Sequence, residues 1–250
     1  HFNRFLKKNK CRRIFILEII LPSQEYLQYL QTKTLKTDRH PFDTSARVFL
    51  HKKQKHQDTT NLIMAQQLEV KELDQVVVRF SGDSGDGMQL AGNIFSTVSA
   101  TVGNGISTFP DYPADIRAPQ GSLTGVSGFQ VHIGTGRVYT PGDLCDVLVA
   151  MNAAALKTQL SHAKPQATII IDTDSFQERD LQKAEFKTAD YLGELGIDRD
   201  RVVACPVTQM VKECLADSGM DNKSILKCRN MFALGLVCWL FNREISLVEQ

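Results

Sequence analysis

A glycine-rich segment at residues 82–87, Gly-Asp-Ser-Gly-Asp-Gly, has residue types that could bind a phosphate. It follows a β-branched run at 75–80 and precedes a helical pattern that begins at Met88. Glycines let the backbone approach an anion, and a helix N-terminus adds free N–H groups and the positive end of a dipole. Asp83 and Asp86, however, would repel a phosphate. The segment therefore fits either a phosphate cradle or a plain tight turn.

The spacing of the glycines argues against two common cofactor motifs. Gly82, Gly85 and Gly87 form G-x-x-G-x-G, whereas dinucleotide sites use G-x-G-x-x-G with an acidic residue about 20 positions later. The acidic candidate here, Asp111, lies in a proline-rich loop. A Gly-Asp-Gly that holds magnesium for thiamine diphosphate would need Asn residues downstream, and residues 110–120 contain none.

The remaining polar residues form no evident catalytic set. Ser84 lacks the G-x-S-x-G surroundings of a nucleophile elbow. Asp172 and Asp174 end a predicted strand, where a helix cap or a solvated turn is the usual role. Asn152 follows another predicted strand and is a plausible helix N-cap. We therefore expect no self-sufficient catalytic site.

The elements that would position these residues alternate along the chain. Short β-branched runs predict strands, and apolar residues at helical spacing predict helices. The strands are expected at 75–80, 106–109, 145–151, 167–172 and 201–207, and the helices at 88–102, 152–161, 207–217 and 223–241. Residues 125–140 alternate, turn at Gly-Thr-Gly and return, which predicts a hairpin. We expect an α/β fold with a mostly parallel sheet, an inserted hairpin and helices on both faces.

Charge separates the N-terminal part of the 250-residue chain from the rest. Residues 1–63 carry 13 Lys/Arg and 5 Asp/Glu, a net of +8, and the remainder carries 16 and 23, a net of −7. The first methionine is Met64, so we interpret the preceding part as sequence upstream of the true start or a mis-called gene. A targeting peptide and a basic nucleic-acid-binding arm are the alternatives. We expect a disordered or non-native extension over 1–74, one α/β domain over 75–242, and the start of a truncated following domain over 243–250.

Hydropathy and cysteine usage argue against a membrane protein and against a zinc or iron–sulfur protein. The longest apolar run, residues 231–241, is shorter than the roughly 20 residues of a membrane span and predicts a buried helix. None of the six cysteines forms a CxxC pair, so neither a zinc site nor an iron–sulfur cluster is signalled. We expect buried free thiols in a reducing cytoplasm, with neither a membrane nor a nucleic acid as a partner.

Four blocks, in order, resemble the α subunit of 2-oxoacid:ferredoxin oxidoreductases, and the 2-oxoglutarate enzymes in particular. They are "VVVRFSGDSGDGMQLAGNIFS", "FPDYPADIRAPQGSLTGVSGFQVHI", "TPGD" and "DVLVAMNAAAL". The resemblance spans residues 75–240 and is to the N-terminal γ-type domain, which is related to a domain of pyruvate:ferredoxin oxidoreductase. It implies that fold for this chain.

The resemblance also implies a reaction. A 2-oxoacid, coenzyme A and oxidised ferredoxin give acyl-CoA, carbon dioxide and reduced ferredoxin. Thiamine diphosphate is expected between a later domain of the α subunit and the β subunit, and the iron–sulfur chemistry elsewhere in the complex. The γ-type domain lacks the thiamine and is similar to a region implicated in coenzyme A handling and subunit assembly. We therefore expect this chain to be an incomplete piece of an enzyme, with no catalytic residue of its own.

Coenzyme A carries phosphates, which call for backbone donors and an arginine. Under the resemblance, Gly82–Gly87 would supply the first and Arg117 the second, through a bidentate contact. We expect these residues to line one cleft at the carboxyl edge of the sheet, together with the hydroxyls of Ser122 and Thr124. Asn152 is a further candidate for the same site.

Three alternatives stay open. Arg117 could instead brace its own loop by pairing with Asp111 or Asp115. The domain could be a non-catalytic assembly module, with residues 110–122 docking a partner subunit. An NAD-dependent dehydrogenase is the third, which the glycine spacing disfavours.

Overall fold

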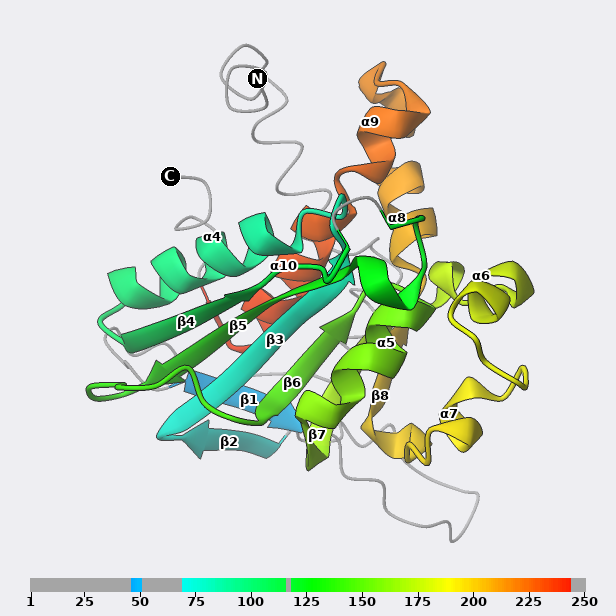
Figure 1. The fold of residues 1–250 in the computed structure, drawn as a ribbon. Coiled ribbons are helices and arrows are strands. Elements are labelled where there is room, and N and C mark those ends of the chain that lie inside the picture. The colour runs from blue at the N-terminus through cyan, green and yellow to red at the C-terminus, as the bar shows by residue number, and fades with distance from the viewer. Residues whose placement is uncertain (1–45, 51–68, 116–117, 244–250) are drawn as a thin grey trace, which may run out of the picture.

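The computed structural model describes residues 46–50, 69–115 and 118–243. A six-stranded sheet forms its centre (Figure 1), in the order β4-β5-β3-β6-β7-β8. In chain order the strands are β3 (Gln75–Asp83), β4 (Gly105–Asp111), β5 (Val126–Gly134), β6 (Cys145–Ala150), β7 (Ala163–Asp172) and β8 (Val202–Cys205). Each strand predicted from a β-branched run is present.

The sheet is mostly parallel, as predicted. β3 pairs with β6, β6 with β7 and β7 with β8 in parallel, and β5 runs antiparallel to both of its neighbours, β3 and β4. The expectation that residues 125–140 form a self-contained hairpin is wrong in its second half, because residues 135–144 contain no strand. Both edges of β5 are already paired, so no edge is left for a returning strand.

The segment after β5 folds back over that strand instead. The Gln130 side chain donates from Nε2 to the carbonyls of Pro141 and Gly142, at 2.9 and 2.5 Å. His132 Nδ1 lies 2.6 Å from the Thr140 carbonyl oxygen. Side chain to backbone bonds thus replace the strand ladder that the Gly-Thr-Gly turn led us to expect.

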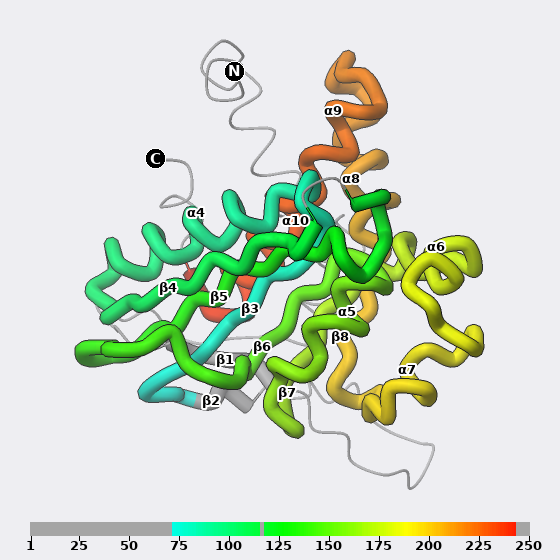
Figure 2. Tube along the Cα trace, in the orientation of Figure 1, coloured from blue at the N-terminus to red at the C-terminus, as the bar shows by residue number. Residues whose placement is uncertain are grey.

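Helices cover both faces of the sheet, as predicted (Figures 1 and 2). They are α4 (Met88–Thr101), α5 (Ala153–Gln159), α6 (Glu178–Lys183), α7 (Tyr191–Glu194), α8 (Val207–Cys214), α9 (Asn222–Leu226) and α10 (Arg229–Leu240), with 3-10 turns η1 (Leu123–Gly125), η2 (Leu160–His162), η3 (Thr173–Ser175), η4 (Arg199–Arg201) and η5 (Ala216–Ser218). The single helix expected over 223–241 is two helices, α9 and α10, with a break at residues 227–228.

The two faces have separate apolar cores, and alternation along β3 supplies both of them. Phe80 faces α4 and α10, where its ring lies 5.8 Å from that of Phe95, which in turn lies 5.7 Å from Phe241. Val77 faces the opposite core, which α5 covers with Leu156. A strand buried on both faces is typical of a parallel sheet with helices on each side.

The chain order creates a switch point between β3 and β6. The connection after β3 passes through α4 to β4 at one end of the sheet, and the connection after β6 passes through α5 to β7 on the other side. The two helices lie on opposite faces, so the loops that follow β3 and β6 diverge. In open α/β sheets this position, beyond the carboxyl ends of the strands, is where ligands bind.

A separate antiparallel pair precedes the main sheet. Strand β1 (Ala46–Leu50) pairs with β2 (Glu69–Leu73), both within the range 1–74 for which we expected an extension. The domain boundaries stay predictions, and the expected extra segment over 243–250 lies, apart from Arg243, outside the described residues. Among the described helices, none has the length and apolar character to cross a membrane.

Four of the cysteines are buried and unpaired in the part of the chain that the structure describes, as the sequence led us to expect. Burial raises the pKa of the thiols of Cys145, Cys205 and Cys238 to about 12, and that of Cys228 to about 11. Such thiols stay protonated at neutral pH and are poor nucleophiles. Their contribution is to packing.

Candidate functional site

The glycine loop, residues 82–87, links β3 to α4; the geometry requires glycine at position 87 and leaves little room for a side chain at position 82. Gly87 is the N-cap of α4 and has φ 74°, in the left-handed region that favours glycine. A Cβ on Gly87 would overlap the Asn230 side chain, lying 3.1 Å from its Cγ. A Cβ on Gly82 would lie 3.0 Å from Asp86 Oδ2. The tight turn that we kept as an alternative to a phosphate cradle therefore accounts for the glycine at position 87.

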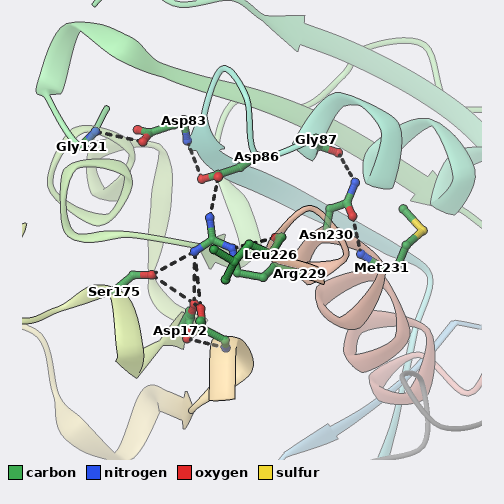
Figure 3. Close-up of polar contacts among 11 residues, drawn as sticks. Asp83, Asp86, Gly87, Gly121, Asp172, Ser175, Leu226, Arg229, Asn230 and Met231 are labelled. Atoms are coloured by element: carbon green, nitrogen blue, oxygen red, sulfur yellow. Dashed lines mark hydrogen bonds and ion pairs between the residues drawn. The ribbon is translucent and has the colours of Figure 1, made fainter. Parts of the chain in front are cut away.

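Asp86 turns back beneath the loop and does not project from it (Figure 3). Its side chain is 7% exposed, and Oδ2 accepts a hydrogen bond from the Asp83 amide at 3.0 Å. Oδ1 pairs with Arg229 Nη2 at 2.7 Å. Asp86 thus serves as an internal anchor whose charge is compensated, and the repulsion expected from it is reduced.

Arg229, the first residue of α10, lies at the centre of this network (Figure 3). Its Nη1 donates to Ser175 Oγ at 3.2 Å and lies 3.7 Å from Asp172 Oδ2. The same nitrogen is 3.5 Å from Thr208 Oγ1. One guanidinium therefore contacts the glycine loop, the turn after β7 and the first turn of α8.

Asp172 ends β7 with a fully buried side chain. Its Oδ2 accepts from Thr208 Oγ1 at 2.7 Å, and its Oδ1 accepts from the Asp174 amide at 3.2 Å. Burial raises the pKa of its carboxyl, while the bonds from Thr208 and the charge of Arg229 oppose that rise. The predicted capping role is confirmed, and the ion pair with α10 is an addition to it.

Asp83 is buried within the loop, with 6% of its surface exposed. Oδ2 accepts from the Gly121 amide at 2.9 Å, whereas Oδ1 has no hydrogen-bond partner among the residues that the structure describes. Burial, and then the charge of Asp86, raise the pKa of this carboxyl, and the nearby Asn152 side chain favours its charged form. A buried carboxylate that is only partly satisfied is costly, and such groups gather at functional sites.

The segment that carries Ser122 and Thr124 lies against the glycine loop. The Ser84 amide donates to the Gly125 carbonyl at 3.2 Å, next to the contact between Asp83 and Gly121. Ser122 Oγ donates to the Pro119 carbonyl at 2.7 Å, and Thr124 is exposed. The structure thus brings the backbone on either side of Ser122 and Thr124 to the glycine loop. Arg117 lies outside the described residues, so its predicted contact is not tested.

The loop supplies fewer free amides than the cradle hypothesis requires. The N–H groups of Asp83, Ser84 and Asp86 donate to Asp86 Oδ2, to the Gly125 carbonyl and to the Asp83 carbonyl. Within the described residues, the amides of Gly85 and Gly87 have no acceptor. An incoming anion would therefore meet the tip of the loop, at exposed Gly85, and not its base.

Asn152 lies on the other side of the switch point, after β6. Its Oδ1 accepts a hydrogen bond from the Ala155 amide at 2.8 Å, so the predicted N-cap of α5 is confirmed. The residue is 9% exposed. Because Oδ1 caps the helix, the side-chain nitrogen Nδ2 is the group of Asn152 that can donate to Asp83 or to a ligand.

Arg79 pairs with Asp111, which is one of the two carboxylates that we considered as partners for Arg117. Its guanidinium forms an ion pair with Asp111 and also donates to Gln159 Oε1 at 2.6 Å and Gln130 Oε1 at 3.1 Å. Burial lowers the pKa of Arg79, and Asp111 opposes that effect. The proline-rich loop is thus anchored to β3 at its first end, independently of Arg117.

Sequence reasoning missed Arg229 and the role of Thr208. The available signal was a charged residue at the start of the apolar run that forms α10. Its partner Asp86 lies 143 positions away, so no local pattern connects the two. Among the described residues, no three His, Cys, Asp or Glu side chains are placed to hold a metal ion.

Comparison with known proteins identifies relatives of the whole α/β region. A model of the protein family described as pyruvate ferredoxin/flavodoxin oxidoreductase matches residues 77–250. The 2-oxoglutarate oxidoreductase subunit KorA of Mycobacterium tuberculosis is 43% identical over 178 residues, which are 71% of this chain and 27% of KorA. The chain therefore spans about a quarter of the length of this curated relative.

Two solved structures are also similar. The 2-oxoglutarate:ferredoxin oxidoreductase from Magnetococcus marinus, with 2-oxoglutarate, coenzyme A and succinyl-CoA bound, matches with a TM-score of 0.52 and 24% identity, over 71% of this chain and 26% of that one. The gamma subunit of keto/oxoacid ferredoxin oxidoreductase from Geobacter sulfurreducens is 21% identical with a TM-score of 0.47, over 70% of this chain and 81% of that one. The first likeness supports the fold.

Proposed function

Because this chain belongs to the pyruvate ferredoxin/flavodoxin oxidoreductase family, we propose that it is the γ-type domain of a 2-oxoglutarate:ferredoxin oxidoreductase. The enzyme converts 2-oxoglutarate, coenzyme A and oxidised ferredoxin into succinyl-CoA, carbon dioxide and reduced ferredoxin. Its partners are the β subunit and ferredoxin, and its place is the cytoplasm. The 43% identity to a 2-oxoglutarate oxidoreductase subunit supports this choice of oxoacid over pyruvate.

Within that enzyme, the domain contributes to coenzyme A handling and to subunit assembly. The observation that carries the first role is the meeting of the glycine loop, residues 118–125 and Asn152 around the switch point. The tip of the loop at Gly85 and the exposed hydroxyl of Thr124 offer donors for phosphates, whereas Ser122 Oγ already donates its proton to the Pro119 carbonyl. Arg117 would add a bidentate charge there.

The decarboxylation and electron-transfer cofactors belong to other parts of the complex in this proposal. Among the described residues, no three His, Cys, Asp or Glu side chains lie together as a bound metal ion would need. Thiamine diphosphate supplies the carbanion chemistry when it is bound, and no step of that chemistry is derived from this chain.

The test uses the full-length protein together with its partner subunit. We expect Arg117→Ala to raise the Michaelis constant for coenzyme A about tenfold to a hundredfold, the range for losing a charge-assisted bidentate contact, and to leave that for 2-oxoglutarate unchanged. Arg199→Ala is the matched control, since Arg199 is 70% exposed in a surface pair with Asp190. Equal constants for the two variants would remove Arg117 from the site.

An assembly role without coenzyme A contact is the second candidate. Exposed aromatic side chains on and beside β4 favour it, because Phe109 is 50% and Tyr112 71% exposed at the start of the proline-rich loop. A Phe109→Ser/Tyr112→Ser variant that loses the partner subunit during gel filtration would support docking at this face. Unchanged assembly would argue against it.

A further inference from the structure

Arg229 spans the switch point of the sheet. Its guanidinium contacts Asp86 after β3 and Asp172 at the end of β7, at 2.7 and 3.7 Å. In the sheet these two strands lie on either side of β6, so the cation bridges across the strand at whose end α/β folds bind ligands. Figure 3 shows it between the glycine loop and the turn that carries Ser175.

Asn230, the next residue, holds the other end of the glycine loop. Its Nδ2 donates to the Gly87 carbonyl at 3.3 Å, and its Oδ1 accepts from the Met231 amide at 2.8 Å. The missing Cβ at Gly87 is what allows the amide to approach. The start of α10 therefore contacts both the carboxylate inside the loop and the residue from which α4 begins.

The charges explain why an arginine is needed at this place. Asp83, Asp86 and Asp172 are enclosed carboxylates, and Arg229 has 16% of its side chain exposed. A guanidinium has five donors in a planar fork, so it can serve Asp86 on one side and the Ser175 and Thr208 hydroxyls on the other. A lysine would keep the charge but has no such fork.

We propose that Arg229 is a positioning residue, which fixes the glycine loop in the conformation that binds coenzyme A. The inference rests on the proposed function. It assigns Arg229 no contact with the ligand, since the effect passes through Asp86 and the loop backbone. Loss of the fork should release the loop without altering the site of the chemistry.

The experiment compares Arg229→Lys with Arg243→Lys in the full-length complex. Arg243 is the matched control because it is also a buried arginine next to α10, 8% exposed, and it donates to Asn104 at 2.8 Å, beyond the opposite end of that helix. For Arg229→Lys we expect a rise of about tenfold in the Michaelis constant for coenzyme A. The turnover number and the Michaelis constant for 2-oxoglutarate should change by less than about twofold. In the control variant, Arg243→Lys, all three constants should change by less than about twofold.

Hydrogen exchange separates this inference from the proposed function. Amides of residues 82–90 should exchange faster in Arg229→Lys and stay unchanged in Arg243→Lys, whatever the substrate. If the wild-type complex does not oxidise 2-oxoglutarate but the exchange result holds, the proposed function fails and the positioning of the loop survives. Equal exchange in both variants overturns the positioning, and so does a fall in turnover with the constant for coenzyme A unchanged.

A second variant protects the test against misfolding. Asp86→Asn keeps an acceptor for the Asp83 amide and removes the partner charge. We expect it to raise the constant for coenzyme A as Arg229→Lys does, and the double variant to cost no more than either single one, because both act through one contact. Fully additive effects would show that Arg229 and Asp86 act separately, and the inference would then be wrong.

Discussion

Three glycine-to-alanine variants separate the two reasons for glycine in this protein. Gly87 combines φ 74° with a neighbour that a Cβ would overlap, whereas Gly219 has φ 70° and open space around it. Gly85 has neither constraint, since nothing lies within 4 Å of its Cβ position and its φ is not in the left-handed region. The series therefore isolates backbone strain, steric overlap and the intrinsic effect of alanine.

The expected changes in unfolding free energy follow from these terms. Alanine restricts the unfolded chain, so Gly85→Ala should stabilise by about 0.5 kcal/mol. A left-handed alanine costs about 1.5 kcal/mol, so Gly219→Ala should destabilise by about 1 kcal/mol after that gain. Gly87→Ala must also displace the Asn230 amide and lose its bond to the Gly87 carbonyl, at about 1 kcal/mol more, for a total of about 2 kcal/mol.

Urea unfolding monitored by tryptophan fluorescence measures these differences. The chain has a single tryptophan, Trp239, and it lies in α10, the helix that carries Asn230. Equal slopes against urea for all three variants would show that their stability changed and that the surface exposed on unfolding did not. If Gly87→Ala were no worse than Gly219→Ala, the contact between Asn230 and the loop would be unimportant, and the reasoning about the start of α10 would be refuted.

Three further predictions concern buried charge and packing. The pKa of Asp83 is raised in the folded state from its ordinary 3.8, so its contribution to stability is present below pH 3.8 and is lost as pH rises through the folded pKa. Asp83→Asn should therefore flatten that part of the curve of unfolding free energy against pH, measured by urea titrations. An unchanged curve would contradict this prediction. Arg79→Met should lower the unfolding free energy by about 3 kcal/mol, because it leaves Asp111 and two glutamines without their donor. Arg199→Met, in an exposed pair, should lower it by under about 1 kcal/mol in the same assay. Gly92→Ala would overlap the Phe129 ring and should lower the melting temperature, whereas exposed Gly136, with open space, should tolerate alanine; similar melting temperatures would be inconsistent with the packing of α4 on β5.

Local patterns were sufficient for most of the fold. The run at 75–80 and the apolar spacing from Met88 each specify an element without reference to distant residues, and both are present. The hairpin over 125–140 was predicted from a local turn, but strand pairing is decided by distant partners. β5 is paired on both sides by β3 and β4, which the sequence at the turn does not reveal.

The candidate site likewise has one part that local sequence patterns predict and one part that they do not. The glycine loop and the Asn152 cap follow from short-range geometry, since both concern a chain that leaves a strand and begins a helix. Arg229 could not be found like this, because its partner Asp86 is 143 residues away. The inward turn of Asp86 also depends on that arginine, so the sequence alone suggested a repulsive carboxylate where the fold contains a compensated one.

Protection from hydrogen exchange by coenzyme A, in the complete enzyme, tests the central claim most directly. If the loops around the switch point bind the carrier, coenzyme A should slow exchange at residues 82–90 and 118–125, and 2-oxoglutarate alone should not. Slowed exchange confined to other parts of the complex, with these two segments unaffected, would contradict the claim that this domain handles coenzyme A.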